Sequence, residues 1–285
     1  MGTLHICTYL IKDRLKNPRI YIGFLFGAAL IISPIQHFLS YAGSMKGYVN
    51  LLEPFIMVTS LREYVMLLVL GALIIFSDVP FITPGVTYLL IRVSRKQWIS
   101  GSFLYIGVIS VLYVLFIGFI SMLLSCRYAF FANFWSDPMQ VLAVYSPDIA
   151  KMNNVHFPYP SILQAMLPIK AALTSFVLMV MYIVTLSEIL FTVNIIKGKI
   201  YGWLATAAVH ASGYILISDA MNGFPIGSLL AHALLAQHYF PSGFLQPGSL
   251  TLSVMIFLVL LALLYFVGQK YMRTFDYIIS VGDRT

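Results

Sequence analysis

Charged residues are scarce in this chain, and their scarcity excludes a water-soluble globular domain. Asp, Glu, Lys and Arg make up 9% of the 285 residues, whereas hydrophobic residues make up 60%. A soluble domain has about a quarter of its residues charged and cannot hide so much apolar surface. The net charge of +7 would suit a nucleic-acid partner. In a membrane protein, however, Lys and Arg gather in cytoplasmic loops, so we predict a lipid membrane and no nucleic acid.

Sequence motifs for catalysis and metal binding are also missing. The chain has no G-x-x-x-x-G-K-[ST] phosphate loop, no H-E-x-x-H zinc helix and no G-x-S-x-G elbow. The two cysteines, Cys7 and Cys126, are expected on opposite sides of the membrane, which excludes a disulfide between them. His232 and His238 lack acidic or thiolate neighbours, and we interpret them as interfacial residues. We therefore predict no catalytic site, metal or cofactor in this chain.

Long apolar stretches are what the sequence does have. A helix needs about 20 apolar residues to cross the hydrocarbon core, and its backbone groups must be hydrogen-bonded within it. The first stretch is too long for the apolar region of a cleavable signal peptide, so we interpret it as a permanent span. The sequence predicts an all-α integral membrane protein, one domain over residues 20–285, with spans at about 20–42, 54–77, 99–125, 168–194, 201–219 and 251–270.

Basic residues are distributed unequally between the connections. Twelve Lys and Arg side chains fall on the side that holds both chain ends, and five fall on the other side. Because cytoplasmic loops carry the excess of Lys and Arg, this pattern predicts six spans with both termini in the cytoplasm.

Three segments outside the spans have patterns of their own. Within residues 1–19, Leu4, Cys7, Ile11 and Leu15 recur at helical spacing, which predicts an amphipathic interfacial helix; a disordered basic tail is the alternative. The aromatic-rich connection 126–167 predicts an ordered outer cap. The connection 220–250 is apolar, broken by Gly and Pro, and free of Lys, Arg, Asp and Glu, which is typical of a re-entrant helical region between spans 5 and 6.

Ionisable residues within spans are costly in lipid, so they are candidates for function. Arg62 and Glu63 lie in the outer third of the second span, Glu188 in the fourth and His210 in the fifth. Each also has a structural interpretation. The Arg62 and Glu63 side chains can mark the water interface, Glu188 can have a purely structural partner, and His210 can be a hydrogen-bonded residue at a helix contact.

The stretch between the second and third spans is compact and basic. Residues 76–106, "FSDVPFITPGVTYLLIRVSRKQWISGSFLYI", resemble the connection between spans 2 and 3 of type-2 ABC export permeases, the membrane subunits that work with a separate ATPase. The resemblance covers the whole arrangement, from the N-terminal helix to the re-entrant region. Within this class, the chain is most similar to bacterial peptide, antibiotic and lantibiotic export or immunity permeases. The chain departs from many members because Asp78 and a proline pair replace a glutamate-rich turn.

The resemblance implies a cytoplasmic coupling helix, expected at 86–95, that docks on the ATPase. It implies that ATP and Mg²⁺ bind in that partner, and that ATP is hydrolysed only in the complex. It also implies a second permease, identical or homologous, for which Gly23 and Gly27 in span 1 and the small-residue face of span 5 are candidate contacts. The expected docking residues are three apolar anchors, three basic residues and one turn residue: Tyr88, Leu89, Ile91, Arg92, Arg95, Lys96 and Asp78.

The expected function is export of an amphipathic or apolar substrate, such as a peptide, an antibiotic or a lipid-like molecule, from the bacterial cytoplasm. The alternatives are a secondary transporter or channel, which usually needs titratable groups near the midplane, and a non-transporting membrane immunity factor. Aromatic side chains would let such a substrate slide with little desolvation cost. The predicted substrate path comprises Arg62, Glu63, Phe134, Trp135, His210 and Glu188.

Overall fold

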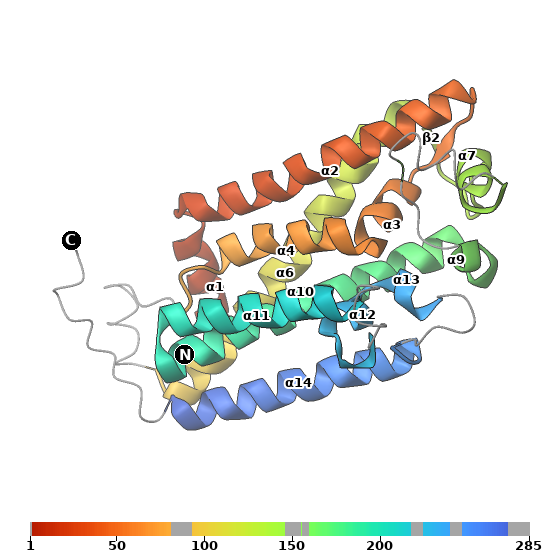
Figure 1. Ribbon diagram of the computed structural model, residues 1–285. Coiled ribbons are helices and arrows are strands. Elements are labelled where there is room, and N and C mark those ends of the chain that lie inside the picture. The colour runs from red at the N-terminus through yellow and green to blue at the C-terminus, as the bar shows by residue number, and fades with distance from the viewer. Residues whose placement is uncertain are drawn as a thin grey trace.

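The computed structural model describes residues 2–80, 93–145, 155, 160–217, 225–239 and 247–272, and these are mostly helical. Long apolar stretches form long helices, which lie side by side along one direction (Figure 1). Five of them are long and apolar enough to cross a membrane, and a bent pair makes up to six. The five are α2 (Pro18–Ser44), α6 (Arg95–Ser125), α10 (Pro168–Lys197), α11 (Lys199–Ile217) and α14 (Leu250–Tyr271).

Shorter elements gather at the two ends of this bundle. Helix α1 (Thr3–Arg14) lies at one end, which the charge pattern predicts to be cytoplasmic and which we name the inner end (Figure 1). Near the opposite, outer end of the bundle the chain forms β1 (Val49–Asn50), η1 (Cys126–Tyr128), β2 (Ala129–Phe130), α7 (Asp137–Gln140), the π-helix η2 (Val141–Tyr145) and α9 (Pro160–Ala165). Between α11 and α14 lie η4 (Pro225–Gly227), α12 (Leu229–Ala233) and α13 (Leu235–His238).

The second predicted span is not one straight helix. It consists of α3 (Glu53–Ser60) and α4 (Arg62–Ile75), which are bent by 88° relative to each other. Leu61 adopts an extended conformation (φ −100°, ψ 127°) and ends the first helix. Glu63 then lies in the first turn of α4, where a carboxylate interacts favourably with the helix dipole. The prediction of one continuous helix over 54–77 is therefore wrong at Leu61.

Helices α2, α4 and α6 approach closely at glycines. A Cβ atom on Gly23 would lie 2.6 Å from the carbonyl oxygen of Gly71, and one on Gly71 would lie 2.5 Å from the Tyr113 hydroxyl. Tyr113 donates a hydrogen bond to the Leu68 carbonyl at 2.8 Å and ties α6 to α4. The G-x-x-x-G of the first span therefore mediates close packing, as the sequence suggests, but this packing is within one chain.

Helix α1 packs on α6, with Ile6 against Gly101. Its buried residues are Ile6, Cys7, Leu10 and Arg14. The helix was predicted correctly, but its apolar stripe was not, because Leu4 is 74% exposed and Leu15 is also exposed. The face of α1 that contacts α6 is shifted by one residue from the predicted apolar stripe. The Leu4 side chain therefore stays exposed.

Helices α12 and α13 are buried in the bundle, where α12 packs against α10 and α11 and α13 packs against α10 and α3. The His232 ring and the Ser253 hydroxyl of α14 form a hydrogen bond of 2.8 Å. The His238 ring donates a hydrogen bond of 2.9 Å to the Gly248 carbonyl. Both histidines are buried within the protein, and their location at the membrane interface stays a prediction. That 225–239 re-enters a bilayer stays a prediction.

Candidate functional site

The chain leaving α4 is fixed to two other helices at the inner end. Asp78 forms an ion pair with Arg19 and accepts a hydrogen bond from the Asn17 side chain at 3.0 Å, which ties it to the start of α2. The Asn194 side chain, near the end of α10, donates to the Val79 carbonyl. The connection to span 3 therefore begins at a point held by both α2 and α10.

The other end of this connection is held by α14. Ser94 caps α6 and forms a capping box with Gln97. Arg95 donates a hydrogen bond at 2.9 Å to the carbonyl of Met272, which follows α14. A cationic side chain is favourable there because the last carbonyls of a helix lack partners within it.

The predicted coupling helix over 86–95 is thus wrong at its end. Arg95 and Lys96 form the first turn of α6, which starts four residues earlier than the predicted span. Both side chains are exposed. Tyr88, Leu89, Ile91 and Arg92 lie outside the described residues, so their docking role stays a prediction.

Arg62 occupies a seam between α4 and α11. Its guanidinium pairs with Glu63 at 2.8 Å and donates to the carbonyl of Ile217, the last residue of α11, at 3.2 Å. It also lies 5.3 Å from the centre of the Tyr214 ring, within cation–π range. The Arg62 side chain therefore joins α4 to α11, whereas Glu63 pairs with Arg62 and is half exposed.

His210 bridges three helices at the same seam. One ring nitrogen lies 2.8 Å from the Tyr182 hydroxyl of α10, and the other lies 3.1 Å from the Met66 carbonyl of α4. Both rings are buried. Because Met66 is one turn beyond Arg62, the two contacts make a continuous polar seam. This arrangement matches the structural interpretation of His210 as a bonded residue at a helix contact.

Glu188 is separate from that seam. It is 0% exposed on α10, and neither carboxyl oxygen has a hydrogen-bond partner among the described residues. The structure therefore does not join Glu188 to His210, although both were predicted to line one path. Its unpaired state is the least expected feature of the bundle, because buried polar groups are nearly always hydrogen-bonded.

Phe134 and Trp135 have different environments in the outer cap. Phe134 is 58% exposed and stacks on Phe130, with ring centres 5.1 Å apart. Trp135 is 5% exposed, and its indole N–H donates to the Met166 carbonyl at 2.9 Å. Phe134 is accessible to a substrate, whereas Trp135 braces the cap.

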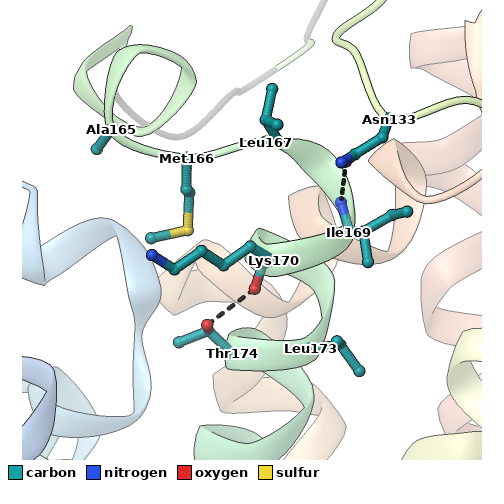
Figure 2. Close-up of a pocket in the computed structure, with 8 residues that line it drawn as sticks. All are labelled: Asn133, Ala165, Met166, Leu167, Ile169, Lys170, Leu173 and Thr174. Atoms are coloured by element: carbon teal, nitrogen blue, oxygen red, sulfur yellow. Dashed lines mark hydrogen bonds between the residues drawn. The ribbon is translucent and has the colours of Figure 1, made fainter.

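A pocket of about 490 Å³ lies beside this bracing contact. Figure 2 shows the Lys170 side chain reaching toward Met166, and the Asn133 side chain meeting the backbone N–H of Ile169, a hydrogen bond of 3.2 Å. The lining is Asn133, Ala165, Met166, Leu167, Ile169, Lys170, Leu173 and Thr174. None of these was among the predicted path residues.

Glu53 is a buried acidic residue that sequence reasoning missed. Its carboxylate accepts hydrogen bonds from the Ser136 N–H and hydroxyl, both at 2.7 Å, and from the Asn50 N–H at 2.9 Å. It thereby joins the start of α3 to the outer cap. A Glu directly before Pro54 at the first turn of a helix was the signal in the sequence, but its partner lies 83 positions away.

Comparisons with family models, with curated proteins and with solved structures find no match to this chain.

Proposed function

We propose that this chain is the membrane-spanning permease subunit of an ATP-driven exporter of the type-2 ABC class. It acts in the bacterial cytoplasmic membrane with both termini inside, and a separate subunit supplies ATP hydrolysis. The observation that carries the proposal is the attachment of the 81–92 connection at both ends, to α2 and α10 through Asp78 and Val79 and to α14 through Arg95.

Such attachments can transmit motion from a partner protein to the membrane-spanning helices. A partner that moves the connection also moves the helix ends bonded to it, because the hydrogen bonds leave little slack at either end. Three spans then receive the motion directly.

The substrate proposed is amphipathic or apolar. The path proposed passes Arg62 and exposed Phe134, whereas the contacts of His210 favour a structural role for that residue. Trp135 supports it indirectly by holding the cap.

The proposed assembly has two permease chains, identical or homologous. The glycines first considered for that contact are engaged inside the chain: Gly23 and Gly27 meet α4 and α6, and Gly202 meets Asn194 of α10. The contact between permeases would instead use exposed apolar residues of α2 and α11, such as Leu25 and Leu204.

Co-purification tests the proposal. The tagged chain is extracted from membranes of its host in mild detergent, and the bound proteins are identified by mass spectrometry. We expect an ATPase with a phosphate loop, two permease chains per complex, and ATP hydrolysis that is lost when the loop lysine of the ATPase is replaced. A complex without any such ATPase contradicts the proposal.

Variants then test the connection itself. Truncating the anchor in Tyr88→Ala should cost about 2 kcal/mol of association, roughly 30-fold in affinity, and Arg92→Glu should cost less. Asp78→Ala should keep the ATPase bound but weaken its stimulation by substrate. Arg127→Glu, on the outer side, is the matched charge-reversal control. Normal binding and normal coupling in the first three variants would show that the connection is not the docking element.

A further inference from the structure

Glu188 combines deep burial with a complete lack of partners. It lies nine residues before the end of α10 at Lys197, which is about 13 Å along the helix axis. Both oxygens are shielded, and neither has a hydrogen-bond partner among the described residues. A carboxylate so placed, if charged, would cost several kcal/mol or more in desolvation.

The neighbouring turn of α10 shows which way Glu188 faces. Phe191 packs on Trp98 and Phe103 of α6, with ring centres 5.8 Å apart in both cases. Thr192 faces Gly268 of α14, where a Cβ atom would lie 3.9 Å from its hydroxyl. Glu188 precedes these two residues by three and four positions, so it lies on the same face one turn farther out. It therefore faces α6 and α14.

Serines on α6 lie on the opposing surface. Ser102 is one turn beyond Trp98 and Ser110 two turns farther, so both share the side of α6 that meets α10. The two serines are 0% exposed, and their hydroxyls, like that of Thr192, have no hydrogen-bond partner among the described residues. Because α6 and α10 run in opposite directions, Ser102 and Glu188 lie at similar depth. Glu188, Ser102 and Thr192, which have no hydrogen-bond partner among the described residues, therefore lie within about one helical turn of one another along the bundle, and Ser110 lies about 12 Å farther out.

The described surroundings supply no positive charge for this carboxyl. Every described Lys and Arg lies in a terminal turn of a helix, in a short 3₁₀ turn or in a connection. Titratable residues of the elements packed around α10 are engaged elsewhere: His210 with Tyr182 and Met66, Tyr265 with Ser100, Tyr113 with Leu68, Tyr105 edge-on to Phe76, His232 with Ser253 and Glu53 with Ser136, while Lys197 and Lys270 lie in the last turns of α10 and α14.

The number of oxygen atoms near Glu188 decides whether this site would bind a metal cation or a proton. A hard cation such as Ca²⁺ or Mg²⁺ takes about six oxygen ligands. One carboxyl and a few hydroxyls do not supply that number, since the helical carbonyls are used within their helices. A proton needs a single carboxyl oxygen and removes the charge that burial disfavours. Internal water can satisfy the remaining hydroxyls, as it does for most buried polar groups that lack protein partners.

We propose that Glu188 is a buried proton-binding site, with water held at Ser102 and Thr192. In the packed arrangement the carboxyl carries its proton. Releasing that proton requires water to enter between α10 and its neighbours α6 and α14. Proton occupancy and the packing of these three helices are therefore thermodynamically linked, whether or not the chain works with an ATPase.

A carbodiimide distinguishes a protonated carboxyl in an apolar site from a charged one. The carboxyl transfers its proton to a carbodiimide nitrogen, and its oxygen bonds to the central carbon of the reagent. No group leaves, so the peptide gains the full mass of the carbodiimide. We expect dicyclohexylcarbodiimide to modify Glu188 at neutral pH in the purified chain, as detected by peptide mass spectrometry. A charged, water-soluble carbodiimide should not reach it. Glu63, exposed and paired with Arg62, is the internal control and should not react with the apolar reagent.

Two variants complete the test. Glu188→Gln keeps the shape and neutrality of a protonated carboxyl, so it should fold with an unchanged unfolding temperature and lose the adduct at this peptide. Glu188→Asp should keep a carboxyl that reacts. Absence of the wild-type adduct would overturn the proposal, and so would a clear fall in the unfolding temperature of Glu188→Gln. Either result would mean that the carboxyl is charged and paired in solution.

Discussion

The α2–α4 crossing gives the sharpest prediction about stability. A Cβ atom on Gly23 would lie 2.6 Å from the Gly71 carbonyl oxygen, whereas ordinary contacts begin at 3.4 Å. That oxygen belongs to the backbone of α4, so no side-chain rotation can relieve the clash. In Gly23→Ala the two helices must separate by about 0.8 Å, a gap that forfeits a quarter to a half of the dispersion energy between atoms in contact.

A control glycine removes the effect of helix propensity. Ala is favoured over Gly in a helix by about 1 kcal/mol, and this gain applies equally to Gly107→Ala in the middle of α6. At Gly107 a Cβ atom would meet nothing within 4 Å. We therefore expect Gly23→Ala to be about 1–3 kcal/mol less stable than Gly107→Ala, which is the usual cost of overpacking.

Unfolding in mixed micelles with increasing dodecyl sulfate, followed by the fluorescence of the three tryptophans, measures this difference. Equal stability of the two variants would refute the reasoning. It would mean that α2 and α4 do not cross at these glycines, and that the G-x-x-x-G is free for contact with a second chain.

Three further predictions concern polar groups. Glu53→Ala should destabilise the chain by about 3 kcal/mol or more in the same assay, because three buried donors lose their acceptor. A double-mutant cycle of Tyr182→Phe and His210→Phe should give a coupling energy of about 1 kcal/mol, whereas additive effects would contradict the hydrogen bond. Cys7 is buried, and burial raises the pKa of its thiol. A maleimide should therefore modify exposed Cys126 and leave Cys7 unmodified, from either side of the membrane, until the protein unfolds. Labelling of Cys7 in the folded protein would show that α1 does not pack on α6.

Apolar length was sufficient to predict the long helices. Runs of about 20 apolar residues have few structural solutions in lipid, and the positions of five long helices follow directly from them. The start of α6 was also readable, since Ser94 and Gln97 have the spacing of a capping box. This signal was missed, and Arg95 was placed at the end of a coupling helix, because basic residues are favourable at a helix C-terminus.

Contacts between distant residues were not readable from the pattern. The bend after α3 depends on Leu61 adopting an extended conformation, although Leu favours helices. Glu53 and Ser136 are 83 residues apart, and Asn17 and Asp78 are 61 residues apart. One chain without its relatives carries no signal that pairs such residues, so the network of the outer cap and the attachment of the connection emerge only in three dimensions.

Two arginines that the sequence marked for function have the same role in the structure. Arg62 donates to the carbonyl of Ile217, the last described residue of α11, and Arg95 donates to the carbonyl of Met272, which caps the end of α14. A helix end leaves carbonyls without partners and carries partial negative charge, so a guanidinium from a neighbouring helix satisfies both. Arg62 would therefore influence a substrate path by joining α4 to α11, and Arg95 would act in coupling by joining α14 to the first turn of α6. Glu188, by contrast, is buried within a span and has no hydrogen-bond partner among the described residues, so no contact of this kind explains it.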